Sequence, residues 1–155
     1  VTMYIGTNSR RLLDEEFACI QLHPAFGYHL LVDCGHERDL AQAALFHHRF
    51  YDESGGYPKE YGSCRPEMKA IVDVLNVADS LDAATDNVGR CYTAAKPPEA
   101  LLEEFNAQKG TRYAPYVVDL FDDPVFRETL KTQLYETRKR VYLEVYHTPD
   151  DRGEE

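Results

Sequence analysis

The residues best suited to chemistry are two adjacent histidines, His47 and His48, which precede a glycine-rich turn and a stretch that carries carboxylates. Imidazole offers a neutral nitrogen near pH 7 and is the commonest metal ligand in proteins, and carboxylates add hard oxygen ligands. Asp79 and Asp82 are three residues apart, so they share one face of a helix. Together with His23 upstream, this combination predicts a metal site. For His23 alone, a core or capping role is the alternative.

A helix must position the histidine pair, and the spacing predicts one over residues 37–50. Its inward stripe would consist of positions at helical spacing, namely Leu40, Ala43, Ala44 and His47. His48 would lie about 100° around the helix from His47. The two histidines would then serve two sides of one cleft.

A second helix, beginning at Pro66, must position the carboxylates. One face of this helix would contain the residues Ile71, Leu75, Ala78 and Asp82, with Val72 and Asp79 on the adjacent strip. A carboxylate on an apolar stripe is costly unless it is paired or bound to a metal. Asp79 and Asp82 are therefore predicted to have a partner, and capping or a salt bridge is the alternative to a metal.

The segment between the two helices contains two glycines and a proline, which predict a loop over residues 52–59. The tripeptide Gly56-Tyr57-Pro58 allows two interpretations at this point. It is either part of a binding site or a structural turn with a packed tyrosine.

Composition limits the classes of protein that fit. The chain has 155 residues, enough for one domain with a single core, and its net charge is −10. Acidity argues against nucleic-acid binding through a general basic surface, whereas bound cations would still admit a small anionic substrate. No apolar run is long enough to cross a membrane, and no signal peptide opens the chain. Four widely spaced cysteines favour free thiols and a cytoplasmic location.

The order of the motifs resembles the HD-GYP family, a branch of the HD metal-dependent phosphohydrolases. The segments that carry the resemblance are, in order, His23-Pro24-Ala25-Phe26-Gly27, His47-His48 with Gly56-Tyr57-Pro58, and Ala78-Asp79-Ser80-Leu81-Asp82-Ala83. The resemblance implies an all-α fold, an HD-domain-like helical bundle. It also implies that divalent transition metal ions (Fe, Mn, Zn or Ni) are held by the residues His23, His47, His48 and Asp79. Asp82 would be an outer residue that supports the ligands or the helix.

The function implied by this resemblance is hydrolysis of a phosphodiester by a metal-activated water, with a cyclic dinucleotide such as cyclic di-GMP as substrate. Arg90, which with Tyr92 matches the family's Arg-x-Tyr, and Lys59 would hold the phosphate. The loop of Gly56, Tyr57 and Pro58 would border the active site and contact a partner signalling domain.

Several departures from the family pattern favour a second hypothesis, a catalytically incompetent signalling or scaffold module. Arg49 stands where Glu is usual, Thr93 and Ala94 replace basic residues, and Ala114 replaces Asp. The family's His-Asp pair is missing, and we expect it to have preceded Val1. An incomplete site would bind one ion weakly or none. A third hypothesis, an HD hydrolase that acts on nucleotides, agrees less well with the Gly-Tyr-Pro motif.

The resemblance covers residues 12–121, so residues 1–123 are predicted to form an N-terminally incomplete HD-GYP-like domain. A C-terminal helical extension is predicted over residues 124–147, and a disordered tail over residues 148–155. An incomplete first helix would expose apolar surface and favour a homodimer.

Overall fold

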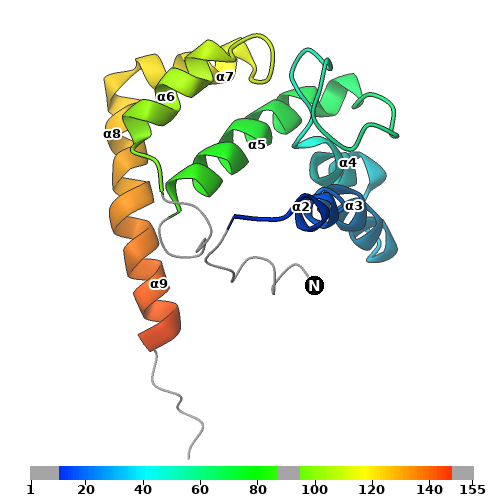
Figure 1. Ribbon diagram of the computed structural model, residues 1–155, viewed down its shortest axis with the longest axis horizontal. Coiled ribbons are helices and arrows are strands. Elements are labelled where there is room, and N and C mark those ends of the chain that lie inside the picture. Colours follow the sequence, from blue (N-terminus) through cyan, green and yellow to red (C-terminus); the bar gives the residue numbers. More distant parts are fainter. Residues whose placement is uncertain (1–10, 87–94, 148–155) are drawn as a thin grey trace, which may run out of the picture. The chain divides into compact units, whose positions relative to one another are not determined.

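The computed structural model describes residues 11–86 and 95–147, and within them the fold is all-α, as predicted (Figure 1). The described residues form helices and two isolated β-bridges, with no strand. The chain divides into two compact units, Val1–Asp119 and Leu120–Glu155. We call them unit 1 and unit 2. Among the described helices, none is both long enough and apolar enough to cross a bilayer.

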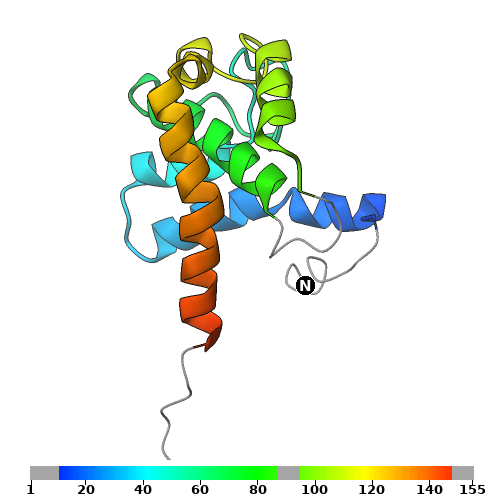
Figure 2. The same cartoon turned by 90° about the vertical axis from the view of Figure 1, so that its left-hand side faces the viewer.

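Unit 1 contains six α-helices among its described residues. Their bounds are α2 Asp14–Ile20, α3 His23–Asp33, α4 Arg38–Phe46, α5 Pro66–Thr85, α6 Pro98–Ala107 and α7 Pro115–Val118. Figure 2 shows α2 and α3 following one another nearly in line. Pro24 lies in the first turn of α3, where its missing N–H costs nothing, so the chain restarts a helix there rather than continuing α2.

The core of unit 1 lies where α4 packs between α3 and α5. Leu45, Phe46 and Val72 are its buried centre. Half-buried side chains from α3 and from the loop before α5 pack against this centre, namely Ala25, Tyr28, Tyr61 and Cys64. This packing brings the C-terminal end of α4 close to the middle of α5, and the histidine pair lies at that end.

Helices α6 and α7 pack against α5. Their contribution to the core is the buried set Leu101, Phe105, Tyr113, Val117 and Val118. The rings of Phe105 and Tyr113 meet edge to face, with centroids 4.7 Å apart. Gly110, after α6, has a φ of +83°, a conformation that favours glycine and lets the chain turn back toward Tyr113.

The inward face predicted for α5 was wrong. Ile71 and Leu75 are 46% and 39% exposed, and Ala78 and Asp82 are also exposed. The buried residues of this helix are Met68, Val72, Asp73, Asn76, Val77, Leu81 and Thr85. Helix α5 has two apolar strips, and periodicity alone does not select between them. The strip that contains polar residues is buried because Asp73 and Asn76 find hydrogen-bond partners across the interface.

The helix predicted over residues 37–50 is also shorter than expected. Helix α4 ends at Phe46, with His47 as its C-cap, and Leu40 is 51% exposed while Ala41 is fully buried. His48 is therefore not placed by helical rotation from His47. Both histidines lie in the turn that follows the helix, where Arg49 N–H donates to the Phe46 carbonyl.

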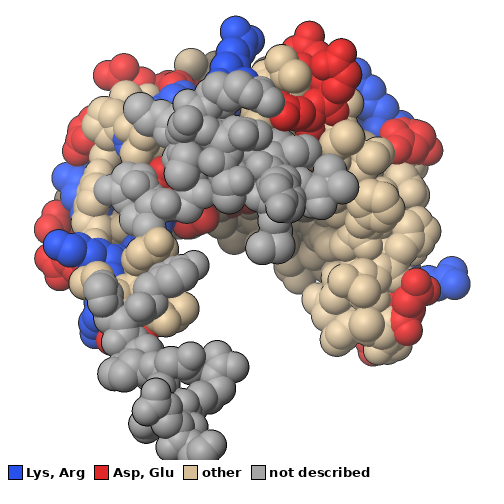
Figure 3. Space-filling view, turned by 60° about the horizontal axis from the view of Figure 1, so that its bottom comes forward, with Lys and Arg blue, Asp and Glu red and all other residues tan. Residues whose placement is uncertain are grey.

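Unit 1 exposes many large apolar side chains. Those at least 39% exposed are Leu13, Phe17, Leu22, Phe26, Leu30, Leu40, Ile71, Val74, Leu75 and Tyr116. Figure 3 shows a wide surface without charged side chains on the side where Figure 1 places α2, α3 and α4. Extended apolar surfaces of this kind commonly mark contacts with other molecules.

Unit 2 is one long helix preceded by a short turn. The 3₁₀ turn Asp119–Asp122 crosses the boundary between the units, and α8 Pro124–Thr132 begins after Asp123, whose side chain accepts from Val125 N–H at 2.8 Å. A π-helical segment, Gln133–Thr137, joins α8 to α9 Arg138–His147, so the helix runs on without a break (Figure 1).

Candidate metal centre

Three histidine rings meet at the junction of α3, α4 and the loop that follows α4. His23 is the first residue of α3, and His47 and His48 lie in the turn that follows α4. One ring nitrogen from each histidine lies within 4.8 Å of those of the other two. The His23 ring centroid lies 5.1 Å from that of His47 and 4.9 Å from that of His48. Residues 24 positions apart in the sequence thus form one half-buried cluster.

Backbone carbonyls fix the protonation of two of these rings. His23 Nδ1 lies 2.7 Å from the Ile20 carbonyl oxygen, and His47 Nδ1 lies 2.8 Å from the Ala44 carbonyl oxygen. A carbonyl oxygen only accepts, so both Nδ1 atoms carry the proton and donate it. In a neutral imidazole, Nε2 then carries a lone pair and no hydrogen. This is the arrangement in which most metal-binding histidines are held, with the second ring nitrogen donating to a carbonyl or carboxylate.

The two Nε2 atoms face each other at 3.1 Å. Two lone pairs at this separation repel unless a cation lies between or beside them. Metal–nitrogen bonds of about 2.0–2.1 Å, at angles between octahedral and tetrahedral, separate neighbouring ligand nitrogens by about 2.8–3.4 Å. The observed 3.1 Å between His23 and His47 agrees with two neighbouring ligands of one ion.

A proton on Nε2 of either ring would relieve the same repulsion by donating to the other ring, and the environment of His47 opposes it on the His47 side. Burial lowers the pKa of His47 from its ordinary 6.5, and the nearby His23 acts in the same direction. The Ala44 carbonyl and Asp79 act against this shift without cancelling it. Near neutral pH, His47 is therefore held in the neutral form that a metal ion requires.

His48 and Asp79 form a second contact at the cluster. His48 Nδ1 lies 3.7 Å from Asp79 Oδ2, and Asp79 projects from the middle of α5. The Asp79 side chain is 40% exposed, so its carboxylate remains accessible from solvent. The structure thus brings His23, His47 and His48 into one cluster and places Asp79 beside His48.

The loop that contains Gly56, Tyr57 and Pro58 borders the cluster. The Tyr57 ring lies against the His48 ring, with centroids 4.5 Å apart, and Tyr57 N–H donates to the His48 carbonyl at 3.3 Å. Gly56 has a φ of +82°, and a Cβ there would lie 2.1 Å from the His48 carbonyl oxygen. The close approach of the loop to the histidines therefore requires glycine at this position.

Arg49 donates hydrogen bonds to backbone carbonyls of the same loop. Its guanidinium donates to the carbonyl of Pro58 at 2.7 Å, and the peptide bond between Tyr57 and Pro58 is cis. Pro58 is buried, whereas Lys59, the next residue, is exposed. Arg49, which departs from the family pattern, thus stabilises the loop from within.

Asn76 is a residue of the site that pattern analysis missed. It lies on α5, is 4% exposed, and its side-chain nitrogen donates to the carbonyls of His47 at 2.7 Å and Arg49 at 3.1 Å. The available signal was an amide in the middle of an apolar helix, three residues before Asp79. Periodicity treats such a residue as outward-facing, and only the fold reveals the carbonyls that it reaches.

A shallow hollow opens beside the cluster, between α4 and α5. Its lining consists of Ala43, Ala44, His47, Leu75, Ala78, Asp79 and Asp82. Asp82 thus lies next to Asp79 on the hollow. These described lining residues include two carboxylates and no lysine or arginine. Of the predicted phosphate ligands, Lys59 lies outside this lining and Arg90 lies outside the described residues.

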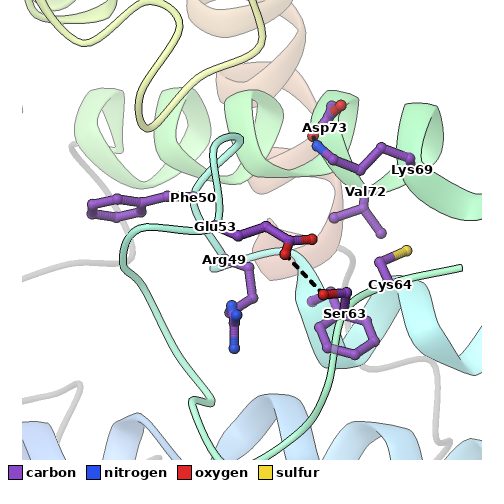
Figure 4. Close-up of a pocket in the computed structure, with 9 residues that line it drawn as sticks. Arg49, Phe50, Glu53, Ser63, Cys64, Lys69, Val72 and Asp73 are labelled. Carbon is purple, nitrogen blue, oxygen red and sulfur yellow. Dashed lines mark hydrogen bonds and ion pairs between the residues drawn. The ribbon is translucent and has the colours of Figure 1, made fainter. Parts of the chain in front are cut away.

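A second polar cluster lies on the buried strip of α5, one turn before Asn76. The Asp73 side chain is 4% exposed, forms an ion pair with Lys69 and accepts a hydrogen bond from Tyr116 Oη at 2.7 Å. The ammonium of Lys69 also lies 4.4 Å from the centre of the Tyr51 ring. Figure 4 shows Lys69 and Asp73 side by side above a small pocket where Ser63 donates to Glu53. No motif in the sequence indicated this cluster.

The chain matches no protein-family model, and a search of curated proteins likewise finds no match. The assignment of the site therefore rests on its geometry and on the order of its motifs.

Proposed function

We propose that unit 1 binds a divalent transition metal ion at the histidine cluster, with His23 and His47 as its first two ligands. The observation that carries this proposal is the 3.1 Å approach of their Nε2 atoms while both Nδ1 atoms donate to backbone carbonyls. His48 and Asp79 are the remaining candidate ligands. A mixed set of nitrogen and oxygen ligands suits Fe, Mn, Zn and Ni.

The reaction we propose is hydrolysis of a phosphodiester, and it follows from the resemblance of the motif order to the HD-GYP family. A cyclic dinucleotide such as cyclic di-GMP is the substrate class that this resemblance suggests. A bound divalent ion would polarise a phosphoryl oxygen and lower the pKa of water at the site. The chain's own residues orient the ligands: the carbonyls of Ile20 and Ala44 hold the two imidazoles, and Tyr57 covers one face of His48.

Substrate binding would take place at the hollow between α4 and α5, which His47 and Asp79 border. Carboxylates at its edge repel a phosphodiester unless bound cations reverse the local field. Lys59 and Arg90 are the residues proposed to hold the phosphate. The described lining of the hollow supplies no positive side chain. The reaction would therefore depend steeply on the bound metal.

The lack of a positive side chain in the described lining of the hollow also supports a second candidate function, a signalling or scaffold module without turnover. The hollow is acidic and apolar rather than basic. Arg49 stands where the family pattern has glutamate, and its guanidinium donates to the Pro58 carbonyl. Such a module would keep the histidine cluster and its loop, and it would bind a partner signalling domain through Gly56, Tyr57 and Pro58.

The test is a hydrolysis assay on the chain purified without chelator and then loaded separately with Mn²⁺, Fe²⁺, Co²⁺, Ni²⁺ or Zn²⁺. Bis(p-nitrophenyl) phosphate reports general phosphodiesterase activity, and cyclic di-GMP reports the proposed substrate class. The variant is His47→Ala. Its matched control is His29→Ala, because His29 is an exposed histidine of α3 whose ring lies 3.4 Å from Tyr61 Oη and outside the cluster.

Metal-dependent hydrolysis that is lost in His47→Ala and kept in His29→Ala supports the enzyme. Metal binding with the same dependence on His47, but without hydrolysis of either substrate, supports the module without turnover. A folded wild-type chain that takes up none of these ions contradicts the proposed metal centre itself.

A further inference from the structure

We infer that Asn76 is a positioning residue for the metal centre, which fixes the backbone from His47 to Arg49 so that the His47 ring meets that of His23. The inference rests on the proposed metal-binding function and extends it to a residue whose amide nitrogen is engaged with the backbone. Asn76 acts through hydrogen bonds to main-chain atoms of the turn that bears both adjacent histidines.

The turn after α4 needs such a residue because the helix ends there. Carbonyls past the end of a helix have no N–H within the helix to pair with, and when they are buried they require other donors. Arg49 N–H pairs with the carbonyl of Phe46. The carbonyls of His47 and Arg49 accept from the two hydrogens of the Asn76 amide, at 2.7 Å and 3.1 Å. One side chain from α5 thus spans the three residues on which the cluster depends.

The orientation of the Asn76 amide is determined by these contacts. Its nitrogen must face the two carbonyls, since the amide oxygen in that place would repel both. Its oxygen is then buried, and among the described residues it has no hydrogen-bond partner. An unpaired buried acceptor destabilises the fold. A leucine of similar size would avoid this cost, so packing alone does not explain an asparagine here.

Asn76 also links the backbone of the histidines to the carboxylate of the site. Asp79 follows Asn76 by three residues on the same helix, and its Oδ2 lies 3.7 Å from His48 Nδ1. The amide of Asn76 fixes the position of the His47–Arg49 turn along α5. Asp79 projects from α5 toward the ring of His48. A shift of the turn along α5 would therefore change both the His23–His47 approach and the His48–Asp79 approach.

The test compares two isosteric variants on one helix. Asn76→Leu removes both donors while keeping the size of the side chain. Thr85→Val is the matched control, because Thr85 is also 4% exposed on α5 and its hydroxyl donates within the helix to the Leu81 carbonyl. Circular dichroism and thermal unfolding establish that each protein is folded at the assay temperature. Asn76→Ala serves as the second variant if leucine is not accommodated.

Two readouts separate positioning from general stability. The first is the nitrogen and proton chemical shifts of the histidine rings in the metal-free protein, which report the Nδ1 contacts of His23 and His47 directly. The second is the affinity for Co²⁺ at a temperature where every variant is folded. We expect Asn76→Leu to move the His47 and His48 ring signals and to weaken Co²⁺ binding about tenfold or more, as the loss of groups that orient metal ligands does. Thr85→Val should leave the ring signals and the affinity unchanged.

Unchanged ring signals and unchanged Co²⁺ affinity in a folded Asn76 variant overturn the inference, and they leave the metal centre standing. A wild-type chain that binds no Co²⁺, with ring signals that still move in Asn76→Leu, contradicts the proposed function while it supports Asn76 as the residue that positions the rings. The same weakening in Thr85→Val as in Asn76→Leu also overturns the inference, because it would trace the effect to the stability of α5.

Discussion

Two polar clusters lie along α5, and they differ in how completely their hydrogen bonds and charges are satisfied. Around Asp73 every strong group faces its complement, since Lys69 supplies a positive charge and Tyr116 a hydroxyl donor. In the histidine cluster, both Nδ1 atoms have carbonyl acceptors, whereas the contact that the two Nε2 atoms make is with each other. The first cluster is closed within the protein, whereas the second brings two ring nitrogens within 3.1 Å of each other.

Under the proposed metal binding, this difference separates a structural role from a binding role. Buried charges that are paired and hydrogen-bonded hold helices together, and removal of one partner leaves the other uncompensated. A cluster whose lone pairs converge is costly on its own and is stabilised by whatever ion enters it. Perturbing the Asp73 cluster should therefore change stability without changing metal affinity, and perturbing the histidines should change metal affinity much more than stability.

The largest effect is expected for His47→Ala, measured as Co²⁺ affinity by competition with a chromogenic chelator. Loss of one of two ligands whose Nε2 atoms are 3.1 Å apart should weaken binding about 100-fold or more, equivalent to about 3 kcal/mol. The free energy of unfolding of the metal-free protein should fall by only about 1 kcal/mol, for the hydrogen bond to Ala44. His29→Ala is the control, and equal weakening in both variants would refute the assignment.

The next largest effect is expected for Asp73→Ala, measured by urea unfolding of the metal-free protein. The carboxylate is 4% exposed and accepts from both Lys69 and Tyr116, so its removal should lower the free energy of unfolding by about 2–3 kcal/mol. Partial exposure of Lys69 keeps the loss below that of a fully buried pair. Co²⁺ affinity of the folded variant should stay at the wild-type value. A large loss of affinity would show that the two clusters are not separate in function.

The smallest effect is expected for Tyr116→Phe. The lost hydrogen bond ends on a charged acceptor, but the tyrosine is 49% exposed, so the free energy of unfolding should fall by about 1 kcal/mol. Desolvation of the phenol and its bond to Asp73 raise the pKa of Tyr116 above its ordinary 10. The unfolded chain therefore loses this proton at a lower pH than the folded protein does. Stability should decline with pH above about 10 in the wild type, and less steeply in the variant.

The all-α fold was predictable because helical spacing and capping signals are local. Pro24 and Pro66 each lie at the start of a helix, where a proline is tolerated, and this could be read without any knowledge of packing. The face that each helix buries was not predictable in the same way. Ile71 and Leu75 are apolar and exposed, while Asp73 and Asn76 are polar and buried, because the partners of these polar residues come from distant parts of the chain.

The candidate site was predictable to the level of residue types and no further. The order of His23, His47, His48 and Asp79 in the sequence indicated a metal site, and the structure brings these residues together. The end of α4 at Phe46 could not be derived from the helical period. The carbonyls of the following turn are held by Asn76, which is 27 residues away from Arg49 in the sequence. Long-range hydrogen bonds of this kind leave no local signal in the sequence.

The most direct test of the metal centre is anomalous diffraction at the cobalt edge from crystals of the chain grown with Co²⁺. We expect one peak within about 2.0–2.2 Å of Nε2 of both His23 and His47. In the same crystals, the two Nδ1 atoms should still donate to the carbonyls of Ile20 and Ala44. An ordered cluster with no anomalous peak, or a peak bound elsewhere on the chain, would contradict the claim that these histidines form a metal site.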